Sequence, residues 1–153
     1  MRYRALLAGE SGPRCRLLTV TVLLLAAFSV GFVAGGNGLG ILVVLCGVAV
    51  AVCAGIARGG LLVAQAAVFS AVVWWAAFPP LVGYLRWDDA ARYRSIRRAD
   101  IYLGPEGELA WGMEAGLGYG ILAAFVLGSV AYGVGALYRS LRRDDPNTHP
   151  YAE

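Results

Sequence analysis

The sequence contains no lysine and one histidine, and few of its 153 residues carry a charge. Charged residues make up 15% of the chain and hydrophobic residues 59%, whereas a water-soluble domain carries about 25% charged residues. The apolar residues also form long uninterrupted blocks instead of the periodic patterns of half-buried elements. These features exclude an ordinary soluble domain and indicate a protein of the lipid bilayer.

All 13 basic residues are arginines, and they flank the apolar blocks. The net charge of +3 could suggest a nucleic-acid partner, but arginines beside apolar blocks suit anionic lipid headgroups better. We therefore expect the lipid bilayer as a partner and no nucleic acid. The absence of lysine, with abundant alanine and glycine, is typical of a prokaryotic G+C-rich genome.

Four segments without Asp, Glu, Lys, Arg or His are close to the roughly 20 residues that a helix needs to span a bilayer. They are residues 17–36, 39–57, 61–80 and 115–138. The sequence thus predicts an all-α integral membrane protein, one domain of residues 1–153 whose four transmembrane helices pack as a small bundle. A polar loop, 86–114, joins the third and fourth helices, and a polar tail covers 139–153. For residues 1–36, a cleaved signal peptide remains the alternative.

The third segment ends in an ambiguous way, because Pro79 and Pro80 disfavour the α conformation of the residue before them. Either the helix stops near Phe78, or it kinks and continues to Leu85. The aromatic residues crowded at this end are typical of a helix that meets the headgroups. They are Trp74, Trp75, Phe78, Tyr84 and Trp87.

Arginines near span ends resist translocation and thus indicate orientation. Four spans place both termini on one side, with Arg2, Arg4, Arg14, Arg16, Arg58, Arg139, Arg142 and Arg143. The other side holds Arg86, Arg92, Arg94, Arg97 and Arg98. This majority predicts a multi-pass protein of the cell membrane with both termini in the cytoplasm. Five arginines on the outer side are a large minority; an odd number of spans would relieve this conflict and stays an alternative.

The polar loop predicts a short interfacial helix over residues 86–98, with Asp88 as its N-cap and Asp88 and Asp89 within reach of Arg92. Its arginines suit a lipid headgroup or a partner protein, since arginine pairs bidentately with phosphate and carboxylate. The candidate contacts are Arg92, Arg94, Arg97 and Arg98. Beyond it, residues 101–103 and 108–111 flank a Gly-Pro-Glu-Gly turn, which predicts a small β-hairpin.

Several kinds of chemistry lack the residues they need. The paired acids Asp88 and Asp89 resemble a magnesium–diphosphate site only superficially, because Arg92 stands where another acid is required. His149 lies in the polar tail, which excludes haem ligation by paired histidines within one chain. Cys46 and Cys53 lie about two helical turns apart, too far for a disulfide. We expect no catalytic, cofactor-binding or metal site.

The first three spans hold no ionisable residue, whereas ion-coupled transporters keep such groups inside the bilayer. Gln65 is the polar residue of interest, because its amide would seek a hydrogen bond on another helix. Small residues recur at every fourth position and predict close helix packing. These helix-packing residues are Gly31, Gly35, Gly47, Ala51, Gly55, Gly112, Gly116, Gly120, Ala124 and Gly128.

Together these features favour a non-enzymatic structural or accessory component of a membrane, within a homo- or hetero-oligomer. The alternative is a small transporter or channel subunit, in which Gln65 and the glycine-rich fourth helix line a pathway. A third class, a lipid-modifying enzyme, would depend on Asp88 and Asp89. The sequence specifies no substrate or partner.

Overall fold

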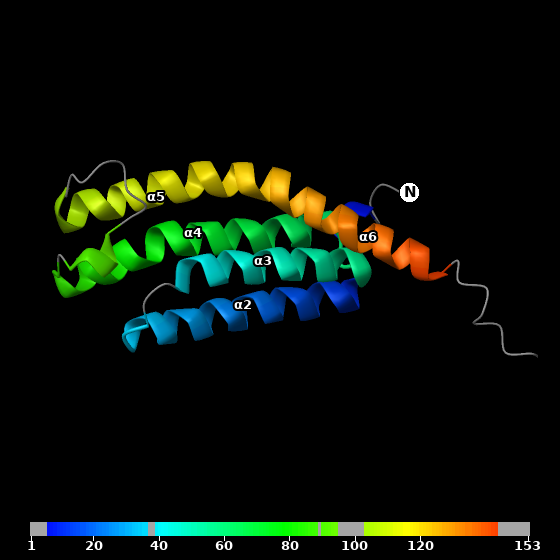
Figure 1. Ribbon diagram of the computed structural model, residues 1–153, viewed down its shortest axis with the longest axis horizontal. Helices are drawn as coiled ribbons and strands as arrows, with labels where there is room; N and C mark the ends of the chain where they lie inside the picture. The colour runs from blue at the N-terminus through cyan, green and yellow to red at the C-terminus, as the bar shows by residue number, and fades with distance from the viewer. Residues whose placement is uncertain (1–5, 37–38, 89, 95–102, 144–153) are drawn as a thin grey trace, which may run out of the picture.

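The computed structural model describes residues 6–36, 39–88, 90–94 and 103–143, and this part contains helices and no strand. The elements are α2 (Ser11–Val33), α3 (Leu39–Ile56), α4 (Leu61–Arg86), the 3-10 turn η1 (Ala91–Tyr93), α5 (Gly104–Ala123), the π-helical turn η2 (Ala124–Gly128) and α6 (Ser129–Arg143). Elements α5, η2 and α6 follow one another as a single curved rod (Figure 1). The fold therefore has four helices that are long and apolar enough to cross a membrane.

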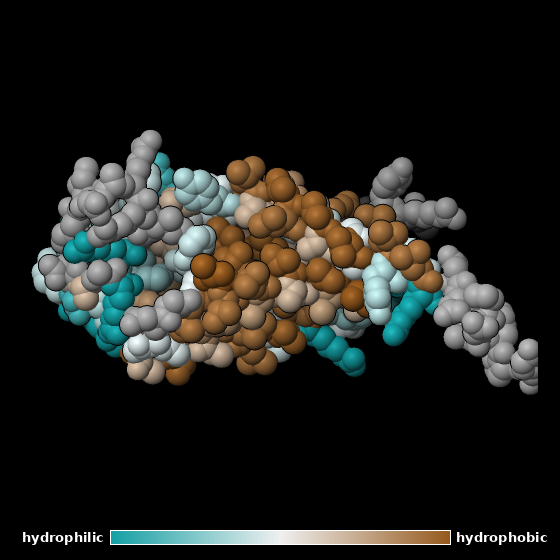
Figure 2. Space-filling model, in the orientation of Figure 1, coloured by the Kyte–Doolittle hydropathy of each residue, from teal (hydrophilic) through white to brown (hydrophobic). Residues whose placement is uncertain are grey.

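The four helices lie side by side, with α4 packed against α2, α3 and α5. Helix α3 also contacts α6, and α2 lies at the margin against α3 and α4. The start of the described chain and the end of α6 lie at the same end of the bundle as the α3–α4 turn (Figure 1). Figure 2 shows apolar residues around the middle of the bundle and polar residues toward its two ends. This distribution is the one expected of a bundle that spans lipid.

The ends of α2, α3 and α4 share one backbone motif. Gly35, Arg58 and Trp87 have positive φ angles of 105°, 58° and 51°. After each of them, a backbone N–H donates to the carbonyl five residues earlier, and the pairs are Gly36 to Gly31, Gly59 to Ala54 and Asp88 to Gly83. This Schellman motif satisfies carbonyl groups that the helix end would otherwise leave unpaired.

Helix α4 continues through Pro79 and Pro80 as far as Arg86, which decides between the two alternatives left by the sequence. Pro80 has no backbone N–H, so the carbonyl of Ala76 loses its donor within the helix. Gly112 of α5 covers that carbonyl so closely that a Cβ on Gly112 would lie 2.6 Å from the Ala76 oxygen. The freed carbonyl of Ala76 therefore faces α5 and is covered by it.

The predicted β-hairpin is wrong for residues 104–111, which form the first turns of α5. The same Gly-Pro-Glu-Gly segment that suits a type I turn also suits a helix start. Pro105 lies in the first turn, where its missing N–H costs no hydrogen bond. Glu106 in that turn interacts favourably with the positive end of the helix dipole. Residues 101–102 lie outside the described part of the chain.

The predicted interfacial helix is reduced, within residues 90–94, to the single turn η1. Among the described residues, Asp88 and Arg92 form no ion pair with each other, and the Arg92 guanidinium donates to the Tyr93 hydroxyl. Instead, the Asp88 Oδ1 atom accepts the backbone N–H of Ala90 at 2.9 Å. Residues 95–98 and Asp89 lie outside the described part, so their share of the prediction is untested.

Candidate functional site

The glycines of the fourth helix lie along α4 in antiparallel register. A Cβ on Gly112 would meet Ala76, one on Gly116 would meet Ala76 and Val73, and one on Gly120 would meet Phe69. Further along, a Cβ on Gly128 would meet the Cα of Gln65 at 3.0 Å. Four of the predicted small residues thus face α4. Because they have no side chains, the two helices can approach each other closely.

The π-helical turn η2 explains how this row stays aligned. Residues four apart drift around an α-helix by roughly 40° at each step, because one turn takes 3.6 residues. Between Ala124 and Gly128 the hydrogen bonds widen to the π pattern, in which each residue turns the chain less. Both ends of η2 are buried, so this turn brings the row back toward α4.

A second close contact joins α3 to α6 and involves a glycine that the sequence did not single out. A Cβ on Gly55 would lie 2.2 Å from the carbonyl oxygen of Tyr132, and one on Gly135 would lie 2.1 Å from that of Val52. The two glycines therefore face each other's helix, backbone against backbone. One turn after Gly135, the Nη1 atom of Arg139 donates to the carbonyl of Gly55 at 2.7 Å, which places a positive charge at the C-terminal end of α3.

The remaining predicted packing residues differ in their surroundings. A Cβ on Gly47 would lie 2.8 Å from the Cβ of Ala71 on α4, and Ala51 and Ala124 are buried. Gly31 has only the side chain of Leu39 near it, and Gly35 faces open space. Close packing of small residues is therefore a feature of α3, α4 and the fourth helix, and α2 is attached differently.

Aromatic side chains attach α2 to α4. The indole Nε1 of Trp74 donates to the hydroxyl of Ser29 on α2 at 2.8 Å. The Trp74 ring stacks on Phe78 at 4.9 Å between centroids and meets the edge of Phe32 at 6.3 Å. With 8% of its surface exposed, Trp74 belongs to the interior and not to the expected interfacial belt. Of the other predicted belt residues, Trp75, Tyr84 and Trp87 are exposed.

Gln65 lies where the fourth helix leaves its π-helical turn. Its Nε2 atom donates to the hydroxyl of Ser129 at 3.2 Å, in a partly buried position. This contact depends on Gly128, because a side chain there would meet the Cα and Cγ atoms of Gln65. The bond joins two helices within the apolar part of the bundle, where such bonds contribute about 0.6 to 2 kcal/mol.

Tyr93 holds the segment after α4 onto the bundle. Its ring is 3% exposed, packs against Gly83 and meets Phe32 edge-on. Its hydroxyl accepts hydrogen bonds from Arg86 and from Arg92, whose guanidinium also lies over the Tyr93 ring. Arg92 is thus turned toward Tyr93, and the predicted arginines Arg97 and Arg98 lie outside the described residues.

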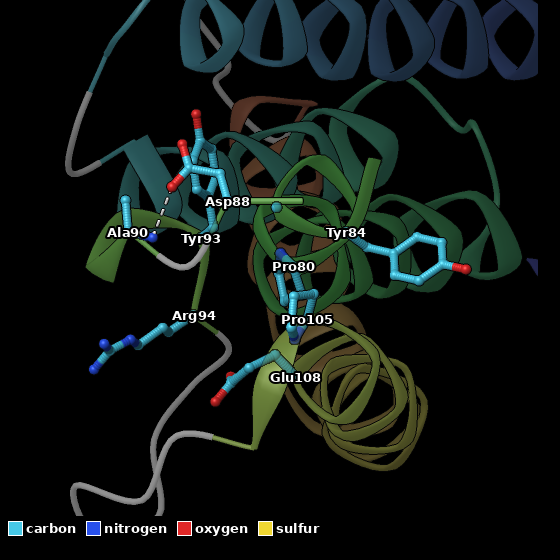
Figure 3. Close-up of a pocket in the computed structure, with 9 residues that line it drawn as sticks. Pro80, Tyr84, Asp88, Ala90, Tyr93, Arg94, Pro105 and Glu108 are labelled. Atoms are coloured by element: carbon cyan, nitrogen blue, oxygen red, sulfur yellow. Dashed lines mark hydrogen bonds between the residues drawn. The ribbon is translucent and has the colours of Figure 1, made fainter. Parts of the chain in front are cut away.

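A small pocket lies beside Tyr93, between the end of α4 and the first turn of α5 (Figure 3). Its polar lining includes Asp88, Tyr93, Arg94 and Glu108, and its apolar lining includes Pro80 and Pro105. Glu108 is 6% exposed. Figure 3 shows Arg94 and Glu108 on the same flank of the pocket. The pocket combines charges of both signs, which suits the attachment of the loop to the bundle.

Within the described ranges, no three His, Cys, Asp or Glu side chains gather in a way that could hold a metal ion. Cys15, Cys46 and Cys53 are free thiols. The chain matches no known family model, and it is not significantly similar to any curated protein or solved structure.

Proposed function

We propose that this chain is a non-enzymatic structural or accessory component of a membrane assembly. The observation that carries the proposal is the uneven burial of its helices. Only 11% of the most apolar stretch of α2 is buried, against 28% to 50% in the other three helices. A helix that leaves most of its apolar surface uncovered offers that surface to lipid and to other membrane helices.

The close glycine contacts support the same role. Because lipid tails give apolar helices no hydrophobic reason to associate, cohesion comes from tight packing and interhelical hydrogen bonds. Helices α3 to α6 have such contacts, so they pack tightly with one another. Helix α2 lies against them and leaves its outer face uncovered. In the oligomer that we propose, this face contacts a second copy or another membrane protein.

Site-specific photo-crosslinking in native membranes tests this role. A photoreactive residue at Val22 or Val30 of α2, which are 64% and 69% exposed, is expected to crosslink to a protein partner. The matched control is Ala64, which is 0% exposed and is expected to crosslink only within the chain. Probes at Leu122 and Phe125 report on the outer face of the fourth helix. A chain that yields only lipid adducts at Val22, Val30, Leu122 and Phe125 contradicts the proposal.

The proposed location is the cell membrane, with both termini in the cytoplasm. The described residues at the terminal end include six arginines and one acid, which are Arg14, Arg16, Arg58, Arg139, Arg142, Arg143 and Glu10. Those at the other end include three arginines and four acids, which are Arg86, Arg92, Arg94, Asp88, Glu106, Glu108 and Glu114. An excess of arginine favours the cytoplasmic side. Labelling of single cysteines from outside the cell tests the orientation.

A second candidate, a transporter or channel subunit, rests on the polar contact at the π-helical turn. Turns of this kind are frequently found at functional sites, and the Gln65–Ser129 bond places two polar groups inside the bundle. In this alternative, the bond opens to admit a solute between α4 and the fourth helix.

Gln65→Leu separates the two candidates. In the structural role, the variant loses one interhelical hydrogen bond, so its free energy of unfolding falls by about 0.6 to 2 kcal/mol. Liposomes that contain the wild type and the variant then show the same solute flux. Ser129→Ala, which removes the acceptor, serves as the matched variant. A flux that is present in the wild type and lost in Gln65→Leu would instead support the pathway.

A further inference from the structure

A groove of about 210 Å³ lies between α4 and the N-terminal part of the chain, at the end of the bundle that holds both termini. Ala8, Arg14 and Leu18 form one wall, and Leu62, Val63 and Ala66 form the other. The groove lies outside the glycine contacts and the Gln65 site. Its lining contains one arginine and five apolar residues.

The helix geometry gives the groove a direction. Arg14 precedes Leu18 by four residues and Leu62 precedes Ala66 by four, so each pair is separated by about one turn, or roughly 6 Å. Both α2 and α4 run inward from this end of the bundle (Figure 1). The guanidinium thus belongs to the mouth of the groove, and its apolar walls lie deeper in the membrane region.

The fold holds this mouth in place through the N-terminal segment. Gly9 packs so closely on the α3–α4 turn that a Cβ there would lie 2.2 Å from the backbone of Gly59. The backbone N–H of Glu10 donates to the Arg58 carbonyl at 2.9 Å, and the side chains form an ion pair at 3.2 Å. Glu10 is thereby engaged with Arg58, and among the described residues no carboxylate lies within ion-pair distance of Arg14.

We infer that this groove binds one anionic phospholipid, with the phosphate at Arg14 and an acyl chain between Leu18 and Ala66. A guanidinium recognises phosphate oxygens by charge-assisted hydrogen bonds. The excess of arginine at this end strengthens the attraction to negatively charged headgroups. A bound acyl chain would cover the weakly buried start of α2 and strengthen its attachment to α4.

Lipid binding to the full-length chain, purified and delipidated in detergent, tests this inference by native mass spectrometry. Phosphatidylglycerol is expected to bind more tightly than phosphatidylcholine with the same acyl chains. Arg14→Gln is expected to weaken phosphatidylglycerol binding about fivefold, the equivalent of about 1 kcal/mol for one arginine near the surface. Arg142→Gln, at the same end but outside the groove, is the matched control and leaves the affinity unchanged.

Ala66→Trp fills the groove and is expected to weaken the binding of both lipids. Val22→Trp, on the outer face of α2, is expected to leave the binding of both lipids unchanged. The inference is overturned if the two lipids bind with equal affinity, or if Arg14→Gln and Arg142→Gln have the same affinity for phosphatidylglycerol. It is also overturned if inorganic phosphate alone displaces the lipid. Arg14 is exposed, so its variant is informative even if Ala66→Trp fails to fold. A chain that selects phosphatidylglycerol but crosslinks to no protein would contradict the accessory role and leave this inference intact.

Discussion

Gly135→Ala is expected to destabilise the bundle by about 2 to 3 kcal/mol, whereas Gly133→Ala on the same helix is not. A Cβ on Gly135 would lie 2.1 Å from the carbonyl oxygen of Val52, while one on Gly133 would have no atom within 4 Å. A single methyl group therefore forces α3 and α6 apart at one position and meets open space two residues away. At Gly133 the better helix propensity of alanine raises the free energy of unfolding by up to about 1 kcal/mol.

Unfolding of the purified variants in a detergent of increasing denaturing strength measures this difference. The double variant Gly55→Ala/Gly135→Ala provides a second test, because both methyl groups require the same separation of α3 from α6. Its loss of stability is expected to be smaller than the sum of the two single losses. Equal effects of Gly135→Ala and Gly133→Ala would show that α3 and α6 do not meet at these backbones.

The bond from Arg139 to the Gly55 carbonyl makes the same contact sensitive to charge. Separation of the helices in Gly135→Ala also moves this carbonyl away from the guanidinium. Part of the expected loss of stability in Gly135→Ala therefore comes from the weakened hydrogen bond at the end of α3, and not from packing alone. If the two contacts are coupled in this way, the substitution Arg139→Gln lowers stability more in the wild-type background than in the Gly135→Ala background.

The sequence predicts the four apolar helices because each apolar block is uncharged and about as long as a bilayer-spanning helix. Their contacts are harder to predict. Gly133 and Gly135 are the same type of residue and lie two positions apart, so only the position of α3 distinguishes them. The start of α5 is not predictable from the sequence because residues 104–107 suit both a turn and a helix start, and the packing of Gly112 on Ala76 favours the helix.

The buried position of Trp74 is also a feature that the sequence could not predict. In a soluble protein, the pattern of polar and apolar residues tells the buried face of a helix from the exposed one. In lipid both faces are apolar, and aromatic residues near the end of a span are equally consistent with a headgroup belt and with an interior cluster. The Ser29 hydroxyl that accepts the Trp74 N–H lies 45 residues away in the sequence, so no local pattern could indicate it.

Trp74→Ala is expected to release α2 from the bundle. The variant removes the ring that stacks on Phe78 and meets Phe28 and Phe32, together with the hydrogen bond to Ser29. Truncation of a buried Trp costs about 3 to 5 kcal/mol in soluble proteins. In lipid we expect about 2 to 3 kcal/mol, because no hydrophobic transfer from water adds to the lost packing.

Reaction of Cys46 with a maleimide measures this release, because Cys46 lies with Thr21 and Phe28 of α2 in a pocket between α2, α3 and α4. In a chain with Cys15 and Cys53 replaced by serine, Trp74→Ala is expected to raise the modification rate several-fold. Trp74→Phe keeps an aromatic ring but loses the hydrogen bond, so its rate is expected to lie between those of the wild type and Trp74→Ala. Tyr119→Ala, at a position 57% exposed on α5, is the matched control and leaves the rate unchanged. An unchanged rate in Trp74→Ala would mean that the aromatic cluster does not hold α2 on the bundle.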